Sequence, residues 1–145
     1  MHISAFIHAT EDAIKVIAAC QQLLPDAFRN DIMFTQRKLQ GHHRNPIIFL
    51  ETTIQNPAVI KESISLIAQQ LRSIDRYLLR QGGHRYLDKK GNLYLRFDKQ
   101  AAYNKQLVFS QADPIRVKIK PHGSTKHIKR IAYIFPDFFL IQNDE

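Results

Sequence analysis

Two short segments of this chain alternate strictly between residue types, and they constrain its fold most. Residues 115–120, IRVKIK, place isoleucine or valine at every odd position and a cation at every even one, and residues 93–97, LYLRF, follow the same period. Successive side chains of a β-strand point to opposite faces, so each segment predicts a strand with one apolar and one polar face. The apolar faces anchor a sheet to a second layer, and Arg116, Lys118 and Lys120 share the other face.

Two helical patterns supply that second layer. Thr10-Glu11-Asp12 has the N-cap and the acidic first turn of a helix, which is predicted over residues 11–23. Asn56-Pro57 opens a longer helix, predicted over residues 58–81. The expected buried residues are Ile14, Ile17, Cys20 or Gln21, and Leu24 in the first helix, and Ile60, Ile64, Ile67, Leu71, Ile74 and Leu78 in the second, with Arg72, Arg76 and Arg80 opposite them.

The order of the segments predicts the fold class. The other expected elements are strands over 2–8, 31–39 and 47–55, and a tight corner or single helical turn over 98–105. The order β-α-β-β-α-β-β indicates an α+β two-layer sandwich, in which two helices cover a mixed, mostly antiparallel sheet. A chain of 145 residues can bury one core, and we assign the domain to residues 1–120. Residues 121–145, first basic and then aromatic, are expected to form an extension that packs on the domain or on a partner.

The composition favours the cytoplasm as the setting. Cys20 has no second cysteine to pair with, and no apolar run reaches the roughly 18–20 residues that a membrane span needs. The N-terminal segment lacks a basic region followed by a long apolar core, so no secretory signal is expected.

Sequence motifs for catalysis and cofactor binding are missing. The chain has no GxGxxG, no GxxxxGK[ST] and no GxSxG, and its histidines lack the HxxxH spacing of a metal site. Asp98 lies between Arg96 and Lys99 and would pair with one of these cations. We therefore expect no enzyme, no cofactor and no metal ion. The less favoured alternative is a hydrolase or nuclease that uses the histidines and Asp98.

The net charge of +8 is concentrated in one part of the chain. Residues 1–71 carry six Lys or Arg and six Asp or Glu, residues 72–130 carry fifteen and four, and residues 131–145 carry none and three. This asymmetry favours a polyanionic partner, either nucleic acid or an acidic membrane surface, over a merely basic soluble protein.

RNA is the polyanion that the placement of these cations favours. Lys and Arg on one face of a sheet neutralise phosphates and release counterions, and tyrosines among them offer rings for bases or sugars. No helix-turn-helix, zinc-finger or RNP motif is visible, which favours RNA bound through its backbone and shape. The expected RNA-binding residues are Gly41, His42, His43, Arg44, Asn45, Arg85, Lys89, Lys90, Arg96, Lys99, Gln100, Tyr103, Arg116, Lys118 and Lys120.

Three segments resemble one known family: residues 6–12, FIHATED; residues 39–47, LQGHHRNPI; and residues 91–103, GNLYLRFDKQAAY. In this order and spacing they are similar to an archaeal RNA-binding family labelled a predicted exosome subunit, whose fold is similar to that of the large-subunit ribosomal protein that binds 5S RNA. The resemblance covers about residues 1–120 and departs at His43-Arg44, where the family has an aromatic and a small residue. It implies a domain without catalytic residues and RNA contacts at Gly41, His42, Asn45, Lys99, Gln100 and Tyr103.

These observations predict a non-catalytic protein that binds structured RNA, with ribosomal RNA among the candidates. It would act in RNA processing or turnover with exosomal proteins, or with ribosomal proteins. The alternative is a protein-interaction subunit that uses the aromatic segment 131–141. The abrupt end of the strand at Asp98 would let Lys99, Gln100 and Tyr103 project from one rigid corner; alternatively, Tyr103 packs in the core and residues 98–100 only cap a turn.

Overall fold

Five strands and several helices build the described part of the chain. The computed structural model describes residues 1–120, apart from the side-chain surroundings of residues 42, 83 and 84. The expected extension over residues 121–145 lies outside this range. The strands are β1 (His2–Ile7), β2 (Thr35–Gln40), β3 (Pro46–Thr53), β4 (Leu93–Phe97) and β5 (Ile115–Ile119); the helices are α1 (Ala13–Gln21), α2 (Asp26–Arg29), α3 (Pro57–Gln70), α4 (Ser73–Gln81) and α5 (Lys99–Tyr103), with 3-10 turns η1 (His42–Arg44) and η2 (Gly83–Tyr86).

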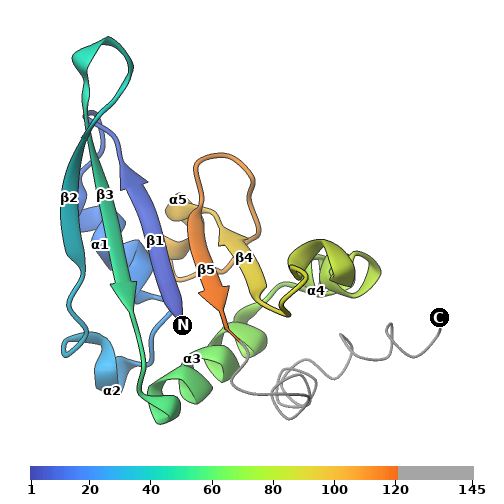
Figure 1. The fold of residues 1–145 in the computed structure, drawn as a ribbon. Helices are drawn as coiled ribbons and strands as arrows, with labels where there is room; N and C mark the ends of the chain where they lie inside the picture. The colour runs from blue at the N-terminus through green and yellow to red at the C-terminus, as the bar shows by residue number, and fades with distance from the viewer. Residues whose placement is uncertain (121–145) are drawn as a thin grey trace.

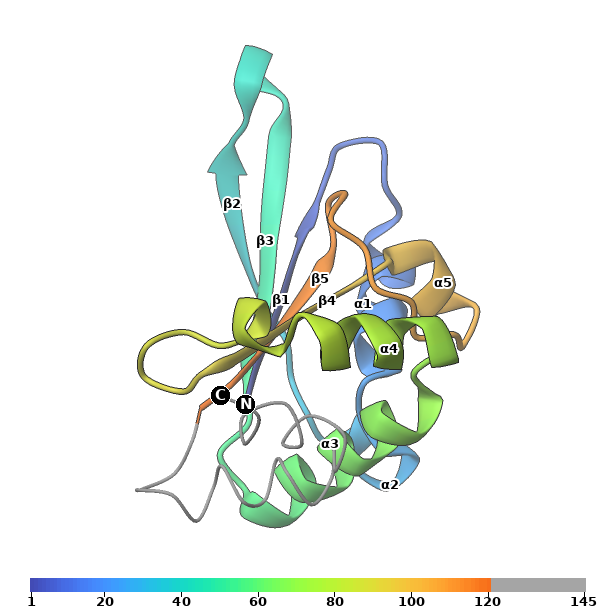
Figure 2. The same cartoon turned by 90° about the vertical axis from the view of Figure 1, so that its right-hand side faces the viewer.

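The strands form one open sheet in the order β2-β3-β1-β5-β4, and every pairing is antiparallel. The helices lie on one side of this sheet, and no helix of residues 1–120 covers the other side (Figures 1 and 2). The α+β class and the five strands are confirmed. The expected mixed sheet is wrong, because β1 and β2, which run parallel, are separated by β3.

The inward side chains of the sheet and the helices form one core. In β4 and β5 the residues at odd positions are buried, whereas those at even positions are exposed or half-buried, which confirms the alternation. The largest fully buried side chains include Phe97, Ile3, Leu50, Leu95 and Ile115. None of the helices in residues 1–120 is long and apolar enough to cross a membrane.

Helix α1 buries most of the expected stripe: Cys20 is buried as predicted, and Ile17 is partly buried against the core. Asp12 caps the helix by accepting a hydrogen bond from the backbone N–H of Ile14 at 2.9 Å. Ile14 itself is 78% exposed, so its expected place in the core is wrong, whereas Leu24 is buried as predicted. Two residues correspond to about 200° of helix rotation, so Ile14 lies on the side opposite Val16. The buried side chains of α1 are Val16, Ala19 and Cys20.

The expected single helix over residues 58–81 is two helices, α3 and α4. Leu71 and Arg72 between them have extended backbone, with ψ of 135° and 153°. The predicted apolar seam is buried throughout α3, from Ile60 to Leu71. In α4 the prediction is wrong, because Ile74 and Leu78 are 52% and 45% exposed. Asp75 and Leu79 are buried in their place.

A contact with a distant segment accounts for this break. The buried carboxylate of Asp75 accepts hydrogen bonds from Arg72 Nε at 2.9 Å and from the backbone N–H of Phe109 at 3.3 Å. Arg76 Nε donates to the carbonyl of Leu71 at 3.2 Å, which satisfies a backbone acceptor at the end of α3. Two of the three arginines expected on a solvated helix face therefore hold the junction between the helices.

Candidate nucleic-acid interface

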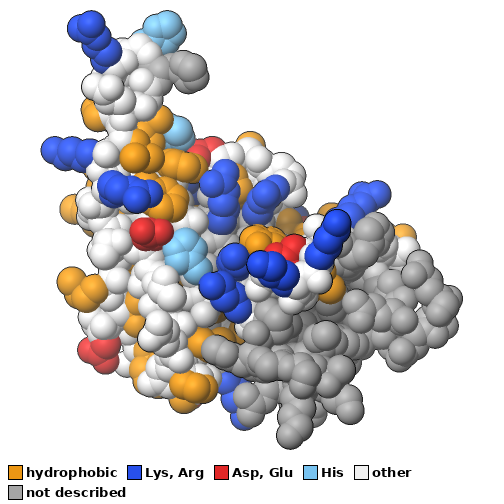
Figure 3. All heavy atoms as spheres, in the orientation of Figure 1, with side chains coloured by type: hydrophobic (Ala, Val, Ile, Leu, Met, Phe, Trp, Pro, Cys, Tyr) orange, Lys and Arg blue, Asp and Glu red, His pale blue; other side chains and the backbone are white. Residues whose placement is uncertain are grey.

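The face of the sheet that no helix of residues 1–120 covers, called the open face below, gathers cations and aromatic rings from all five strands. The antiparallel registers pair Arg37 with Phe49, Phe49 with Phe6, and Arg96 with Arg116. Figure 3 shows this face with blue and orange side chains side by side. The registers place on it Thr35, Arg37 and Leu39 of β2; Ile47, Phe49, Glu51 and Thr53 of β3; His2, Ser4 and Phe6 of β1; Arg116 and Lys118 of β5; and Tyr94 and Arg96 of β4.

Four of these side chains form a row across four strands, called the aromatic row below: Arg37, Phe49, Phe6 and Arg116. The ring centroids of Phe6 and Phe49 are 5.2 Å apart. The guanidinium carbon of Arg37 lies 5.3 Å from the Phe49 centroid, and that of Arg116 lies 5.3 Å from the Phe6 centroid. Both distances are within the range of cation–π contacts. The row therefore has an aromatic centre with a cation at each end.

The five strands contribute four cations and one acid to the open face. Glu51 is that acid, and its Oε2 lies 3.0 Å from Nε2 of His2. At the edge of the same face formed by β4 and β5, Lys118 Nζ lies 5.5 Å from the ring centroid of Tyr94. Arg96 donates a hydrogen bond to Oε1 of Gln111 at 2.9 Å. The open face is therefore cationic where β4 and β5 meet and also at the β2 edge.

An ordered turn over residues 88–92 borders this face. Oδ1 of Asp88 accepts hydrogen bonds from the backbone N–H groups of Lys90 and Asn92 at 2.8 and 2.9 Å. Oδ2 accepts from Asn92 Nδ2 at 2.7 Å and from the Tyr94 hydroxyl at 3.0 Å. These hydrogen bonds, chiefly those from Asn92, lower the pKa of Asp88 to about 2. The turn holds the exposed Lys89 and Lys90 beside Tyr94.

Strands β2 and β3 project beyond the rest of the sheet as a two-stranded arm (Figure 1). Every residue of β2 is exposed, so neither face of the arm is covered along this strand. At the tip, a Cβ on Gly41 would lie 2.6 Å from Ile47 Cδ1 and 2.9 Å from the carbonyl oxygen of Asn45, which only glycine avoids. His43 and Arg44 both have φ of 60°. The tip is thus a specific backbone conformation that presents exposed His43, Arg44 and Asn45.

The corner after β4 is the short helix α5. Asp98 caps it, because its Oδ2 accepts a hydrogen bond from the backbone N–H of Ala101 at 2.8 Å. This cap differs from the expected pairing of Asp98 with Arg96 or Lys99. The helix buries Ala102 and leaves Tyr103 39% exposed, so Tyr103 is not a core residue.

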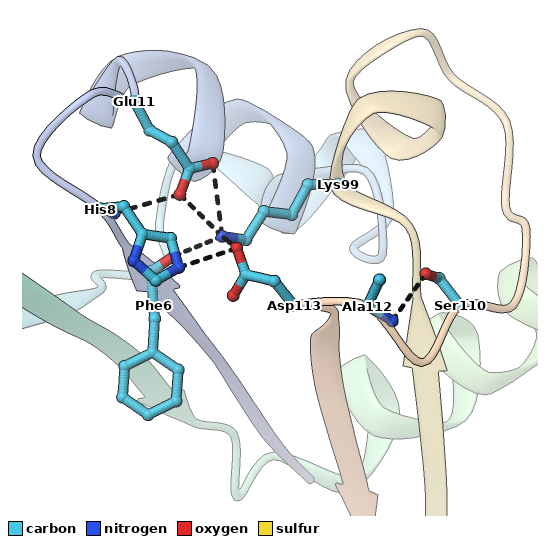
Figure 4. A network of polar contacts seen from close by, with 7 residues as sticks. All are labelled: Phe6, His8, Glu11, Lys99, Ser110, Ala112 and Asp113. Atoms are coloured by element: carbon cyan, nitrogen blue, oxygen red, sulfur yellow. Dashed lines mark hydrogen bonds and ion pairs between the residues drawn. The ribbon is translucent and has the colours of Figure 1, made fainter.

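Lys99 lies in an ion-paired cluster at this corner (Figure 4). Its Nζ is 2.7 Å from Oδ2 of Asp113, 3.0 Å from Oε1 of Glu11 and 2.5 Å from the carbonyl oxygen of Phe6. Nε2 of His8 lies 2.9 Å from the same Asp113 oxygen. The side chain of Lys99 is 12% exposed, so two acids and a carbonyl already occupy its donors. Its ammonium also fills the space between the two carboxylates, where a metal ion would bind.

Gln100 and Tyr103 lie on the helical layer. With Lys99, Glu11, Asp12 and residues of α1 that include Lys15, they line a shallow pocket of about 180 Å³, in which Lys15 Nζ is 5.7 Å from the Tyr103 ring centroid. Pockets for small ligands are usually about 300–1,000 Å³, so this one is small for such a role. The three expected RNA-binding residues of the corner therefore line one small pocket together with two acids, on the helical layer and apart from the cations of the open face.

The other expected residues lie around the open face. Arg96, Arg116 and Lys118 are on it, Lys120 follows β5, and Arg85 is exposed in η2 before the turn over 88–92. Sequence reasoning missed the aromatic row. The signal was present in part: the face opposite Leu50 in β3 contains Phe49, and the alternation of residues 2–8 contains Phe6. Only the register between the strands brings the two rings together.

Comparisons with known proteins agree with a nucleic-acid partner. Residues 1–121 match the model of a protein family described as RNA binding. The chain is 34% identical over 122 residues to the RNA-binding protein PAB1135 of Pyrococcus abyssi, covering 83% of this chain and 79% of that protein. It is 33% identical over 106 residues to the uncharacterized protein MJ0213 of Methanocaldococcus jannaschii, covering 70% and 68% of the two chains.

A solved structure extends the similarity to the fold. The crystal structure of protein SSO0741 from Sulfolobus solfataricus superposes with a TM-score of 0.73 at 26% identity, over 93% of this chain and 96% of that chain. The family model spans more than half of the chain, and its match coincides with the sheet and helices described above. The chain therefore belongs to the family described as RNA binding.

Proposed function

We propose that this protein is a non-catalytic RNA-binding protein, with residues 1–120 as the RNA-binding domain, and that it acts in RNA processing or turnover. In this role it binds structured RNA and works with exosomal or ribosomal proteins. The observation that carries the proposal is the open face, where four cations and one acid lie on a sheet that no helix of residues 1–120 covers. Family membership supports the same class of partner.

The open face suits a phosphate backbone because its cations are displayed on a rigid support. Arg37, Arg116 and Lys118 are attached to paired strands, so the backbone positions from which they reach out are set before RNA arrives. The turn over 88–92 and the tip of the arm place further cations at two sides of the same face. Neutralising several phosphates at once releases their counterions, which makes the affinity strongly dependent on salt.

Residues outside the open face receive other roles in this proposal. Lys99 positions the corner by joining α5 to Glu11 and to Asp113, and does not contact phosphate. Burial raises the pKa of the Cys20 thiol to about 12, so the thiol is protonated at neutral pH and is a poor nucleophile. This protonation supports a binding role without thiol chemistry.

The proposal is tested by measuring the affinity for a structured RNA at increasing salt. We expect a linear fall of log affinity with log salt, and Arg116→Ala should reduce the slope by about 0.7–0.9 if it removes one phosphate contact. Lys61→Ala, which removes an exposed cation from α3 on the helical layer, is the matched control and should leave the slope unchanged. A protein without RNA affinity at about 50 mM salt contradicts the proposal.

A further inference from the structure

We propose that Phe6 and Phe49 form a stacking site for an unpaired base of the bound RNA, with Arg37 and Arg116 moving from the rings to the flanking phosphates. This inference rests on the proposed function, because it specifies which part of an RNA the open face binds. It adds to backbone recognition a requirement for at least one nucleotide outside a duplex.

The two rings are not needed for the core. They lie on β1 and β3, on the face opposite the buried Ile3, Ala5 and Leu50, and both are half-buried at the open side of the sheet. Neither is among the residues that form the core or among the partly buried residues packed against it. Two adjacent phenyl rings in the middle of a face that also carries four cations therefore have a surface to offer to a ligand.

The guanidinium groups over these rings can give way to a base. An exposed cation–π contact shifts an equilibrium about two- to five-fold, whereas stacking of a base on an aromatic side chain contributes about 5- to 150-fold. A base that replaces a guanidinium on a ring is therefore the stronger partner. The displaced guanidinium of Arg37 or Arg116 stays close to the ring because its strand holds it there. From this place it reaches the phosphates that flank the stacked nucleotide.

Stacking on these rings selects unpaired nucleotides. Inside a duplex both faces of each base are covered by its neighbours, so away from the duplex ends a base reaches Phe6 or Phe49 only from a loop, a bulge or a single strand. Every base has an aromatic face, so the site has little preference for sequence. The RNA class that fits is a structured RNA whose unpaired segment crosses the centre of the sheet while its backbone contacts the cations.

The test compares a blunt-ended RNA duplex with the same duplex carrying a short uridine bulge. The wild-type protein should bind the bulged RNA about 5- to 150-fold more tightly. The double variant Phe6→Leu/Phe49→Leu keeps apolar side chains on both strands and should lose this preference, so that its affinities for the two RNAs become equal. Tyr77→Leu removes an exposed ring from α4 and is the matched control, which should keep the preference.

Three results overturn the inference. The first is equal affinity of the wild-type protein for the two RNAs, and the second is an unchanged preference in a double variant with an unfolding transition like that of the wild type. The third comes from photocrosslinking with 5-iodouridine placed in the bulge. We expect crosslinks to the peptide that contains Phe6 or Phe49. Crosslinks confined to the arm tip or to the turn over 88–92 contradict stacking. If the wild-type protein binds neither RNA, the proposed function itself is overturned.

Discussion

The open face and the α5 corner contain similar residues and present them in opposite ways. On the open face, Arg116 lies over an aromatic ring, and the five strands contribute a single acid. At the corner, Lys99 is nearly buried and pairs with both Glu11 and Asp113. The first cation is available to a phosphate, whereas the second is already neutralised. A positive residue therefore offers its charge to a phosphate only where its surroundings leave that charge unpaired.

The largest expected effect comes from Lys99→Met. Removing the nearly buried ammonium leaves the partly exposed Glu11 and Asp113 facing each other, so the free energy of unfolding should fall by about 1–3 kcal/mol. Urea denaturation measures this change, with Lys61→Met as an exposed control. The salt slope of RNA binding should not change. A stable variant with a lower slope would instead place Lys99 on the RNA and erase the difference between the two regions.

Gly41→Ala should have the next largest effect. This substitution tests whether the arm is as rigid as the sheet that carries it. The added Cβ meets Ile47 and the Asn45 carbonyl below 3 Å, and we expect a loss of about 1–2 kcal/mol in unfolding free energy. Gly82→Ala is the control, because its Cβ would be 3.3 Å from the nearest atom. Faster amide exchange should be confined to the arm. Equal effects of the two substitutions would contradict a tightly packed tip.

A smaller effect is expected for Glu51→Gln, which removes the acid from the open face. RNA affinity should rise about two- to five-fold at low salt, because a negative charge beside Arg37 and Arg116 weakens their attraction for phosphates. The lost contact with His2 is half exposed, so stability should change by less than about 1 kcal/mol. Fluorescence anisotropy with labelled RNA measures the change. An unchanged affinity would show that the RNA does not pass over this part of the sheet.

The smallest effect concerns the turn over residues 88–92 at the border of the open face. Because the pKa of Asp88 is lowered to about 2 from an ordinary value of 3.8, its carboxylate stabilises the folded state fully above pH 3.8. That contribution is lost as the pH falls from 3.8 towards 2. At neutral pH, Asp88→Asn should reproduce the loss as faster amide exchange at Lys90 and Asn92. Unchanged exchange would mean that backbone geometry alone holds the turn.

Local patterns predicted the elements well where each element depends on its own residues. The alternation in 93–97 and 115–120 is confirmed because burial on one face of a strand follows directly from period two. Asn56-Pro57 starts α3 as predicted, with the Asn56 side chain accepting a hydrogen bond from the Ala58 backbone N–H. The prediction of a single long helix is wrong at Leu71, because the Asp75 side chain accepts a hydrogen bond from a backbone group 34 residues away.

The sequence alone was enough to predict an α+β fold with five strands and one cationic strand face and to suggest RNA as the partner, since period, end signals and charge are properties of short segments. Only the tertiary structure decided which cations remain available. Lys99 meets Glu11 across 88 residues, and Phe6 meets Phe49 through the register of β1 and β3. These contacts depend on packing and strand order, which neighbouring residues do not encode. Pairing across the fold therefore separates a neutralised corner from the surface that we assign to RNA.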